Sequence, residues 1–282
     1  SLAEQEVLTP EMETAVKAAD TLQRLEDLYR PYRPKRLTRA TKARQKGLQP
    51  LAELVIAQPV AGTRTSLAAA FISAGGEDGV TSVEEAYQGA RDIVAETLTD
   101  DPETRTAIRK LAQRRGVLNV EVTDRSKDPN GTYELYYNFV ADVRQMRPHQ
   151  VLALNRGEQE DVLKVTMTIP EPEALGILAT RFPIDAGSAL SEDLLTARKD
   201  GYDRLLFPAI EREIRRDLTE MADQHAIGVF ATNLRSLLLQ PPLRGQVVMG
   251  IDPGYRTGCK IAVVDTTGKV LATRTIYPDR ER

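Results

Sequence analysis

The chain is 282 residues long, with 41% hydrophobic and 28% charged residues, a balance that is typical of globular proteins and excludes the disordered and fibrous classes. The formal net charge of −3 gives no overall field that attracts nucleic acid, so binding of DNA or RNA requires a local cluster of cations. The single cysteine, Cys259, excludes an intramolecular disulfide, a Cys-rich zinc site and a Cys-x-x-Cys redox pair, and favours a reducing, cytoplasmic location.

The sequence contains neither a predicted membrane helix nor a predicted signal peptide. No run approaches the roughly 18 apolar residues that a membrane helix needs, so no membrane partner is expected. The first six residues lack both the pattern of a signal peptide and an initiator Met. We therefore expect the chain to be a piece of a longer protein.

Helix signals dominate the first four-fifths of the sequence. Thr9 as N-cap and Pro10 at the first helical position predict a helical pattern that continues to Leu28. Pro31 and Pro34 then exclude regular helix. Further helices are predicted over residues 38–47, 50–55, 82–98 and 102–116. Four compact helices in sequence indicate a helical array.

The starts of these helices carry capping residues. Thr38 is the predicted N-cap of a short basic helix that stops at Gly47. Ser82 with Glu85 three residues later predicts a capping box.

A small β element is predicted over about residues 117–170. Residues 117–122 alternate and form one predicted strand, which can pair with a second at residues 162–169. Between them, a helix is predicted from Pro148 to Asn155 and closed by Gly157.

A long helical stretch is predicted from Ser191 to Gln240, interrupted only near Gly201 and Pro208. One apolar stripe with four-residue spacing follows it. The stripe consists of Leu206, Ile210, Ile214 and Leu218.

The pattern changes at the prolines of residues 241–245, which are predicted to be a linker. Short strands follow at residues 247–251, 260–264 and 270–276, the last after a turn that begins at Asp265. The predicted domains are therefore a helical region (1–240) with its small β insertion, the linker (241–245) and a strand-rich region (246–282).

A basic segment is the first candidate binding site. It holds eight cations without an acid among them, a concentration that can neutralise phosphates without sequence preference. The alternative is that these cations form a solvated helix face and balance the charge of acids on neighbouring helices. The eight cations are Arg30, Arg33, Lys35, Arg36, Arg39, Lys42, Arg44 and Lys46.

Asp252 leaves an apolar strand into a glycine-bracketed turn, residues 250–258. RNase H-like nucleases use such an acid to hold two metal ions, and actin-like kinases and ATPases use a similar loop for phosphates. A lone Asp cannot form a two-metal site, and Asp265 is better explained as a turn residue. We expect no catalytic residue, Asp252 being at most a vestigial first-strand acid.

Four aromatic residues lie near three arginines, a mixture that suits single-stranded nucleic acid or a packed aromatic cluster. The packed cluster is favoured because three tyrosines fall at helical spacing. The residues are Tyr133, Tyr136, Tyr137, Phe139, Arg144, Arg147 and Arg156. No metal-ligand spacing, catalytic triad or Walker-type loop is present in the sequence, so no metal and no cofactor are expected.

Several segments in the same order resemble the Tex family of bacterial transcription accessory proteins. They are residues 30–41 (RPYRPKRLTRAT), 47–52 (GLQPLA), 149–157 (HQVLALNRG) and 250–260 (GIDPGYRTGCK). The last looks like the start of the family's YqgF domain, which is RuvC- and RNase H-like. The resemblance implies a mainly α fold: a multi-helix array with a small β element, followed by the first strands of an RNase H-like α/β domain. Asp252 matches the first-strand acid of that fold.

The resemblance also implies a cytoplasmic protein that associates with transcription and continues into an RNA-binding OB-fold domain. Our first hypothesis is a nonenzymatic scaffold that binds RNA or DNA with little sequence specificity through the basic segment. One alternative is a metal-dependent RuvC- or RNase H-like nuclease whose remaining acids lie beyond residue 282. The other is a protein-docking platform for RNA polymerase or the ribosome.

Overall fold

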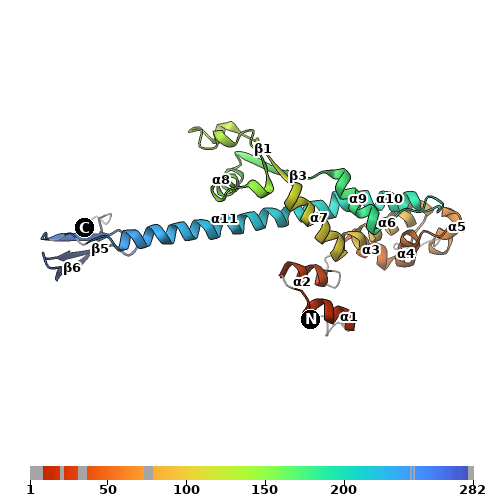
Figure 1. Ribbon diagram of the computed structural model, residues 1–282, viewed down its shortest axis with the longest axis horizontal. Coiled ribbons are helices and arrows are strands. Elements are labelled where there is room, and N and C mark those ends of the chain that lie inside the picture. Colours follow the sequence, from red (N-terminus) through yellow and green to blue (C-terminus); the bar gives the residue numbers. More distant parts are fainter. Residues whose placement is uncertain are drawn as a thin grey trace. The chain divides into compact units, whose positions relative to one another are not determined.

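A computed structural model describes residues 9–19, 22–30, 37–72, 79–241, 243 and 245–278. The fold is mainly helical with two small antiparallel sheets, as the sequence predicted (Figure 1). The chain divides into two compact units, Ser1–Ala226 and Ile227–Arg282, with the boundary inside the last helix. None of the helices within the described ranges is both long enough and apolar enough to cross a membrane.

The predicted helices lie close to their expected positions, whereas the helices Arg64–Ala68 and Glu171–Arg181 and the strand Val140–Asp142 were not predicted. In chain order the helices are α1 (Pro10–Lys17), α2 (Leu22–Tyr29), α3 (Arg39–Gln45), α4 (Gln49–Ala57), α5 (Arg64–Ala68), α6 (Val83–Asp100), α7 (Pro102–Arg115), α8 (Pro148–Gln159), α9 (Glu171–Arg181), α10 (Ser191–Asp200) and α11 (Phe207–Leu238). The strands are β1 (Val117–Val122), β2 (Val140–Asp142), β3 (Leu163–Thr168), β4 (Val248–Asp252), β5 (Cys259–Val264) and β6 (Val270–Ile276).

Helix α6 is the centre of one hydrophobic core. It buries ten residues along its length and packs against α3, α4, α5 and α10, which surround it in Figure 1. Its start is capped by Ser82, whose hydroxyl accepts a hydrogen bond from the Glu85 amide at 3.1 Å. The reciprocal half of the predicted capping box is wrong: the Glu85 carboxylate accepts from the amide of Thr81 instead, while its other oxygen binds Lys46.

The second core lies under the sheet β2-β1-β3, in which β1 pairs antiparallel with both neighbours. The predicted pairing of the two strands is thus confirmed. Alternate residues of β1 and β3 are buried, as a half-covered sheet requires, and helix α8 contributes Val151 and Leu154 to the same core. The predicted apolar stripe is also confirmed, because Leu206, just before α11, and Ile210 and Ile214 of α11 are buried in this core.

The outer edge of β3 is held by carboxylates. The Val165 amide donates to Glu158 of α8 at 3.1 Å, and the Met167 amide donates to Glu211 of α11 at 2.7 Å. Free strand amides are templates for unwanted pairing, so these side chains both satisfy the edge and fix the sheet to α11. Arg215 of α11 pairs with the same Glu158.

Helix α8 does not end at Gly157, so that prediction is wrong. The helix continues to Gln159, and the positive φ, 55°, falls on Asp161. Gly157 is needed for close packing, because a Cβ there would lie 2.5 Å from Cδ1 of Leu163.

The expected interruption of the long helix at Gly201 is a π-helical segment, Gly201–Leu206, in which the Phe207 amide donates to the Tyr202 carbonyl. A Cβ at Gly201 would lie 3.1 Å from the Ala95 carbonyl oxygen of α6, so the glycine permits this close approach. Pro208 causes no break, because it lies in the first turn of α11, where a missing amide is tolerated.

In the second unit, the strands follow the order β4-β5-β6, all antiparallel. They match the predicted strands, and Asp265 opens the predicted turn, accepting from the amides of Thr267 and Lys269. Among the described residues of this unit, Gly258 alone is buried. The predicted linker and domain limits stay predictions.

Candidate nucleic-acid interface

Helix α3 carries the described core of the basic segment. Its N-cap Thr38 accepts a hydrogen bond from the Thr41 amide at 3.0 Å. Ala40 and Ala43 face α6 and are buried, because small side chains let the two helices approach closely. Of the three cations of α3, Arg39 and Lys42 are exposed, whereas Arg44 is half-buried and reaches Glu96 of α6.

Three of the eight cations pair with acids of α6. Arg30, which follows α2, lies 3.2 Å from Asp100, Arg44 lies 2.8 Å from Glu96, and Lys46 lies 2.8 Å from Glu85. Hydrogen bonds from Lys46, and then from Thr81, lower the pKa of Glu85 to about 2. These three cations are therefore engaged in joining the basic segment to the helical array.

Two cations of the segment are open to solvent. Arg39 and Lys42 are exposed and three residues apart on α3, and neither has an ion-pair partner among the described residues. Arg33, Lys35 and Arg36, also predicted as binding residues, lie outside the described residues. Of the five predicted cations that the structure describes, three are thus paired with acids and two are exposed.

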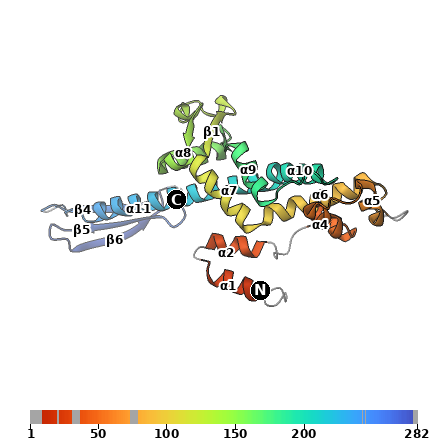
Figure 2. The ribbon, with the colours of Figure 1, turned by 45° about the vertical axis from the view of Figure 1, so that its right-hand side comes forward.

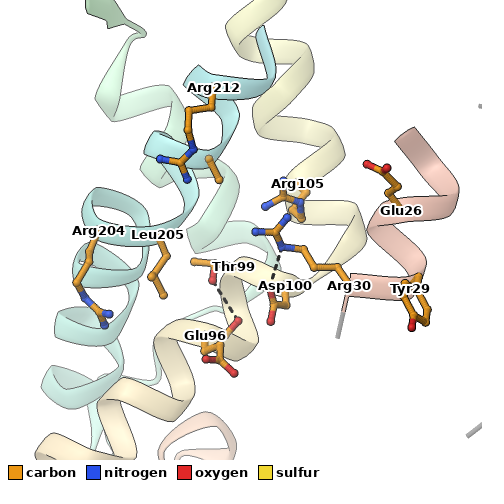
Figure 3. A pocket seen from close by; sticks show the side chains of 11 residues that line it. Glu26, Tyr29, Arg30, Glu96, Thr99, Asp100, Arg105, Arg204, Leu205 and Arg212 are labelled. Atoms are coloured by element: carbon orange, nitrogen blue, oxygen red, sulfur yellow. Dashed lines mark hydrogen bonds and ion pairs between the residues drawn. The ribbon is translucent and has the colours of Figure 1, made fainter. Parts of the chain in front are cut away.

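A cavity of about 620 Å³ lies beside Arg30, between α2, α6 and the start of α11 (Figure 3). In Figure 3, Arg30 is directed toward Asp100, while Arg204 and Arg212 reach in from the opposite wall. Arg204 is matched by Asp92 and Asp200, at 3.0 and 2.5 Å. Four arginines and three acids line the cavity, and Arg105 and Arg204 also have acidic partners outside the lining.

Arg105 at the cavity wall belongs to a buried ionic network. Its side chain is 1% exposed and pairs with Asp27 of α2, 2% exposed, and with Glu213 of α11. Arg109, one turn later, contacts the same two acids at 2.8 and 2.9 Å. The network joins α2, α7 and α11.

The sequence analysis did not predict this ionic network. A signal was present, because Arg105 and Arg109 are four residues apart beside Ile108 and Ala112 on the buried face of α7. Their partners lie about 80 and 100 residues away, at separations that periodicity does not detect.

Asp252 ends β4 with an exposed side chain, opposite Lys260 of β5. Asp265 is occupied with the amides of its own turn. Among the described residues, no group of three His, Cys, Asp or Glu side chains is placed to hold a metal ion.

The aromatic residues form a packed cluster, as predicted. Tyr133 is buried, and its hydroxyl donates to Glu160 at 2.8 Å. The Tyr137 hydroxyl donates to Asp128, and the rings of Tyr136 and Phe139 meet edge to face at 5.4 Å. Tyr136, Tyr137 and Phe139 are half-buried against the core, and the guanidinium of Arg125 lies over the Tyr137 ring, 5.1 Å from its centre.

Comparison with known proteins gives two family matches. The model described as "Tex central region-like" matches residues 61–230, and the model described as "Tex protein YqgF-like domain" matches residues 246–282. The described strands β4, β5 and β6 therefore lie in the YqgF-like region.

Relatives match over most of the chain. The protein YdcI of Bacillus subtilis is 43% identical over 98% of this chain and 38% of its own length. The transcriptional accessory protein Tex of Neisseria gonorrhoeae is 33% identical over 100% of this chain and 37% of its own length. The human S1 RNA-binding domain-containing protein 1 is 30% identical over 83% of this chain and 24% of its own length.

The chain thus spans less than two fifths of the length of these relatives. Because the central-region model alone covers more than half of the sequence, the chain belongs to the Tex family.

Proposed function

We propose that this chain is a nonenzymatic, nucleic-acid-binding scaffold of a transcription accessory protein. It binds the phosphate backbone of RNA or DNA with little sequence preference. The contacts come from the cations of the basic segment that α6 does not neutralise.

One observation supports the proposal most directly. In a chain of net charge −3, Arg39 and Lys42 stand in solvent on a rigid helix whose other cations are paired. Exposed cations on a fixed element can displace condensed counterions from phosphates at little entropic cost. The names of the Tex relative and of the human relative, which refer to transcription and to RNA binding, agree with this role.

Fluorescence-anisotropy titration with single-stranded RNA, single-stranded DNA and duplex DNA, each over a salt series, tests the proposal. We expect binding whose affinity falls steeply with salt. Replacing Arg33, Arg36 and Arg39 with Glu should strongly reduce retention at low salt, whereas the matched change of Lys17, Lys127 and Lys269 to Glu should have a smaller effect. Absence of binding by the unchanged chain even at low salt would contradict the proposal.

The nonenzymatic part has its own test. Incubation with labelled nucleic acid and Mg²⁺ or Mn²⁺ should leave the substrate intact, because a lone Asp252 cannot clamp both reacting oxygens. Metal-dependent cleavage that disappears in Asp252→Asn would contradict the nonenzymatic part of the proposal and favour the nuclease alternative.

A further inference from the structure

The C-terminal end of α7 and the segment that leads into α8 carry a second group of cations. We call it the α7–α8 basic surface, and it consists of Lys110, Arg114, Arg115, Arg144 and Arg147. All five side chains are exposed. They are separated by up to 37 positions in sequence, so no single run of charge revealed the group.

Backbone pairing brings the two halves of this surface together. The Val143 amide donates to the Gly116 carbonyl at 2.8 Å, one residue from Arg115 on one side and from Arg144 on the other. The register of β1 and β2 continues this contact, with Val117 opposite Asp142. Figure 2 shows α7 ending at β1, next to α8.

The charges of this surface are poorly balanced. Glu173 of α9 lies 3.3 Å from Arg115 and 4.0 Å from Arg114. No ion pair within the described parts of the chain involves Lys110, Arg144 or Arg147. Here the five cations outnumber the single acid that lies within ion-pair distance of them among the described residues.

Folding alone explains only part of this arrangement. Arg114 and Arg115 lie in the last turn of α7, where the helix dipole favours cations. Lys110 and Arg114, however, are like charges at i and i+4, a spacing at which their repulsion destabilises the helix. Arg147 is the N-cap residue of α8, at the end where a cation is disfavoured. An external anion would relieve both repulsions.

We propose that the α7–α8 basic surface binds the phosphate groups of an RNA or DNA backbone. This inference rests on the proposed function and adds a second contact surface to it. We expect this surface to bind without sequence preference. Its guanidinium and ammonium groups contact phosphates, which are the same at every base pair.

The test compares two neutralised variants of the full chain in the same titrations with single-stranded RNA, single-stranded DNA and duplex DNA. One carries Arg114→Gln, Arg144→Gln and Arg147→Gln. The matched control carries Lys17→Gln, Lys127→Gln and Lys269→Gln, the same loss of charge at exposed positions elsewhere. A third variant carries Arg114→Lys, Arg144→Lys and Arg147→Lys and keeps the charge. Circular dichroism verifies that each variant folds.

We expect the first variant to bind at least about tenfold more weakly and to lower the slope of log affinity against log salt by about 2 to 3, as three lost phosphate contacts require. The control should change little, and the Lys variant should bind nearly as the parent does. The three nucleic acids show which backbone the surface prefers.

Two negative results can be told apart. If the chain binds but the first variant matches the control, the inference is overturned and the proposed function stands. If the unchanged chain binds none of the three nucleic acids at low salt, both are overturned.

Discussion

Individual acids of α6 decide which cations of the basic segment remain available. Arg44 and Lys46 have partners 2.8 Å away, so their use by a phosphate requires an ion pair to break first. The Lys46–Glu85 pair is exposed and therefore weak and sensitive to salt, whereas the Arg44–Glu96 pair includes a buried carboxylate. Arg39 and Lys42 face no such competition from the described residues.

The Lys46–Glu85 contact can be tested through its acid. Glu85 has an ordinary pKa of 4.5 that is lowered to about 2, with the Lys46 hydrogen bond as the largest cause. Lys46→Met should therefore raise this pKa toward 4.5, as measured by NMR titration of the Glu85 carboxyl carbon. An unchanged pKa would mean that Lys46 is free for ligands.

The same pKa has a consequence for stability. A carboxyl group whose pKa is lower in the folded state stabilises the fold above its unfolded value and loses that contribution as pH falls. The Glu85 contribution is thus present above about pH 4.5 and is lost between about pH 4.5 and 2. Glu85→Gln should flatten this part of the stability profile.

At the scale of elements, two helical glycines look alike in sequence and differ in the fold. Gly157 of α8 lies against Leu163, whereas Gly176 of α9 has nothing within 4 Å of its added Cβ. The effect of a side chain at Gly157 therefore depends on packing against Leu163, whereas at Gly176 it depends on helix propensity.

Alanine substitution should separate the two. Gly176→Ala should stabilise the protein by about 0.5–1 kcal/mol, because Ala is the better helix former. Gly157→Ala should destabilise it by about 1–3 kcal/mol through overpacking against Leu163. Urea denaturation gives the change in free energy of unfolding for both variants. Equal effects of the two changes would show that the Leu163 side chain moves aside without cost.

At the scale of the whole molecule, the two units differ in how much they bury. The first has two hydrophobic cores, while Gly258 is the single buried residue in the described part of the second. Local stability follows buried apolar contact, so the units should open independently.

Hydrogen exchange measures this difference. Amides of α6, a helix with ten buried residues, should exchange slowest. Amides of β4, β5 and β6 should exchange orders of magnitude faster, because strands without a covered face are marginally stable. Equal protection of β5 and α6 would show that the second sheet is covered in solution.

The sequence by itself determined the helical class, the positions of most helices and strands, the packed aromatic cluster and the family resemblance. These depend on local signals, such as the Thr38 cap, the stripe from Leu206 to Leu218 and the motif at residues 250–260.

Only the tertiary structure decided which charges remain free. Three contacts join residues far apart in the chain: the network of Asp27, Arg105 and Glu213, the pairing of Arg44 and Lys46 with acids of α6, and the backbone hydrogen bond from Val143 to Gly116. Charge availability is a property of neighbours in space, and sequence periodicity reports only neighbours along one element. The same reason explains Gly157, whose role depends on Leu163 in a different element.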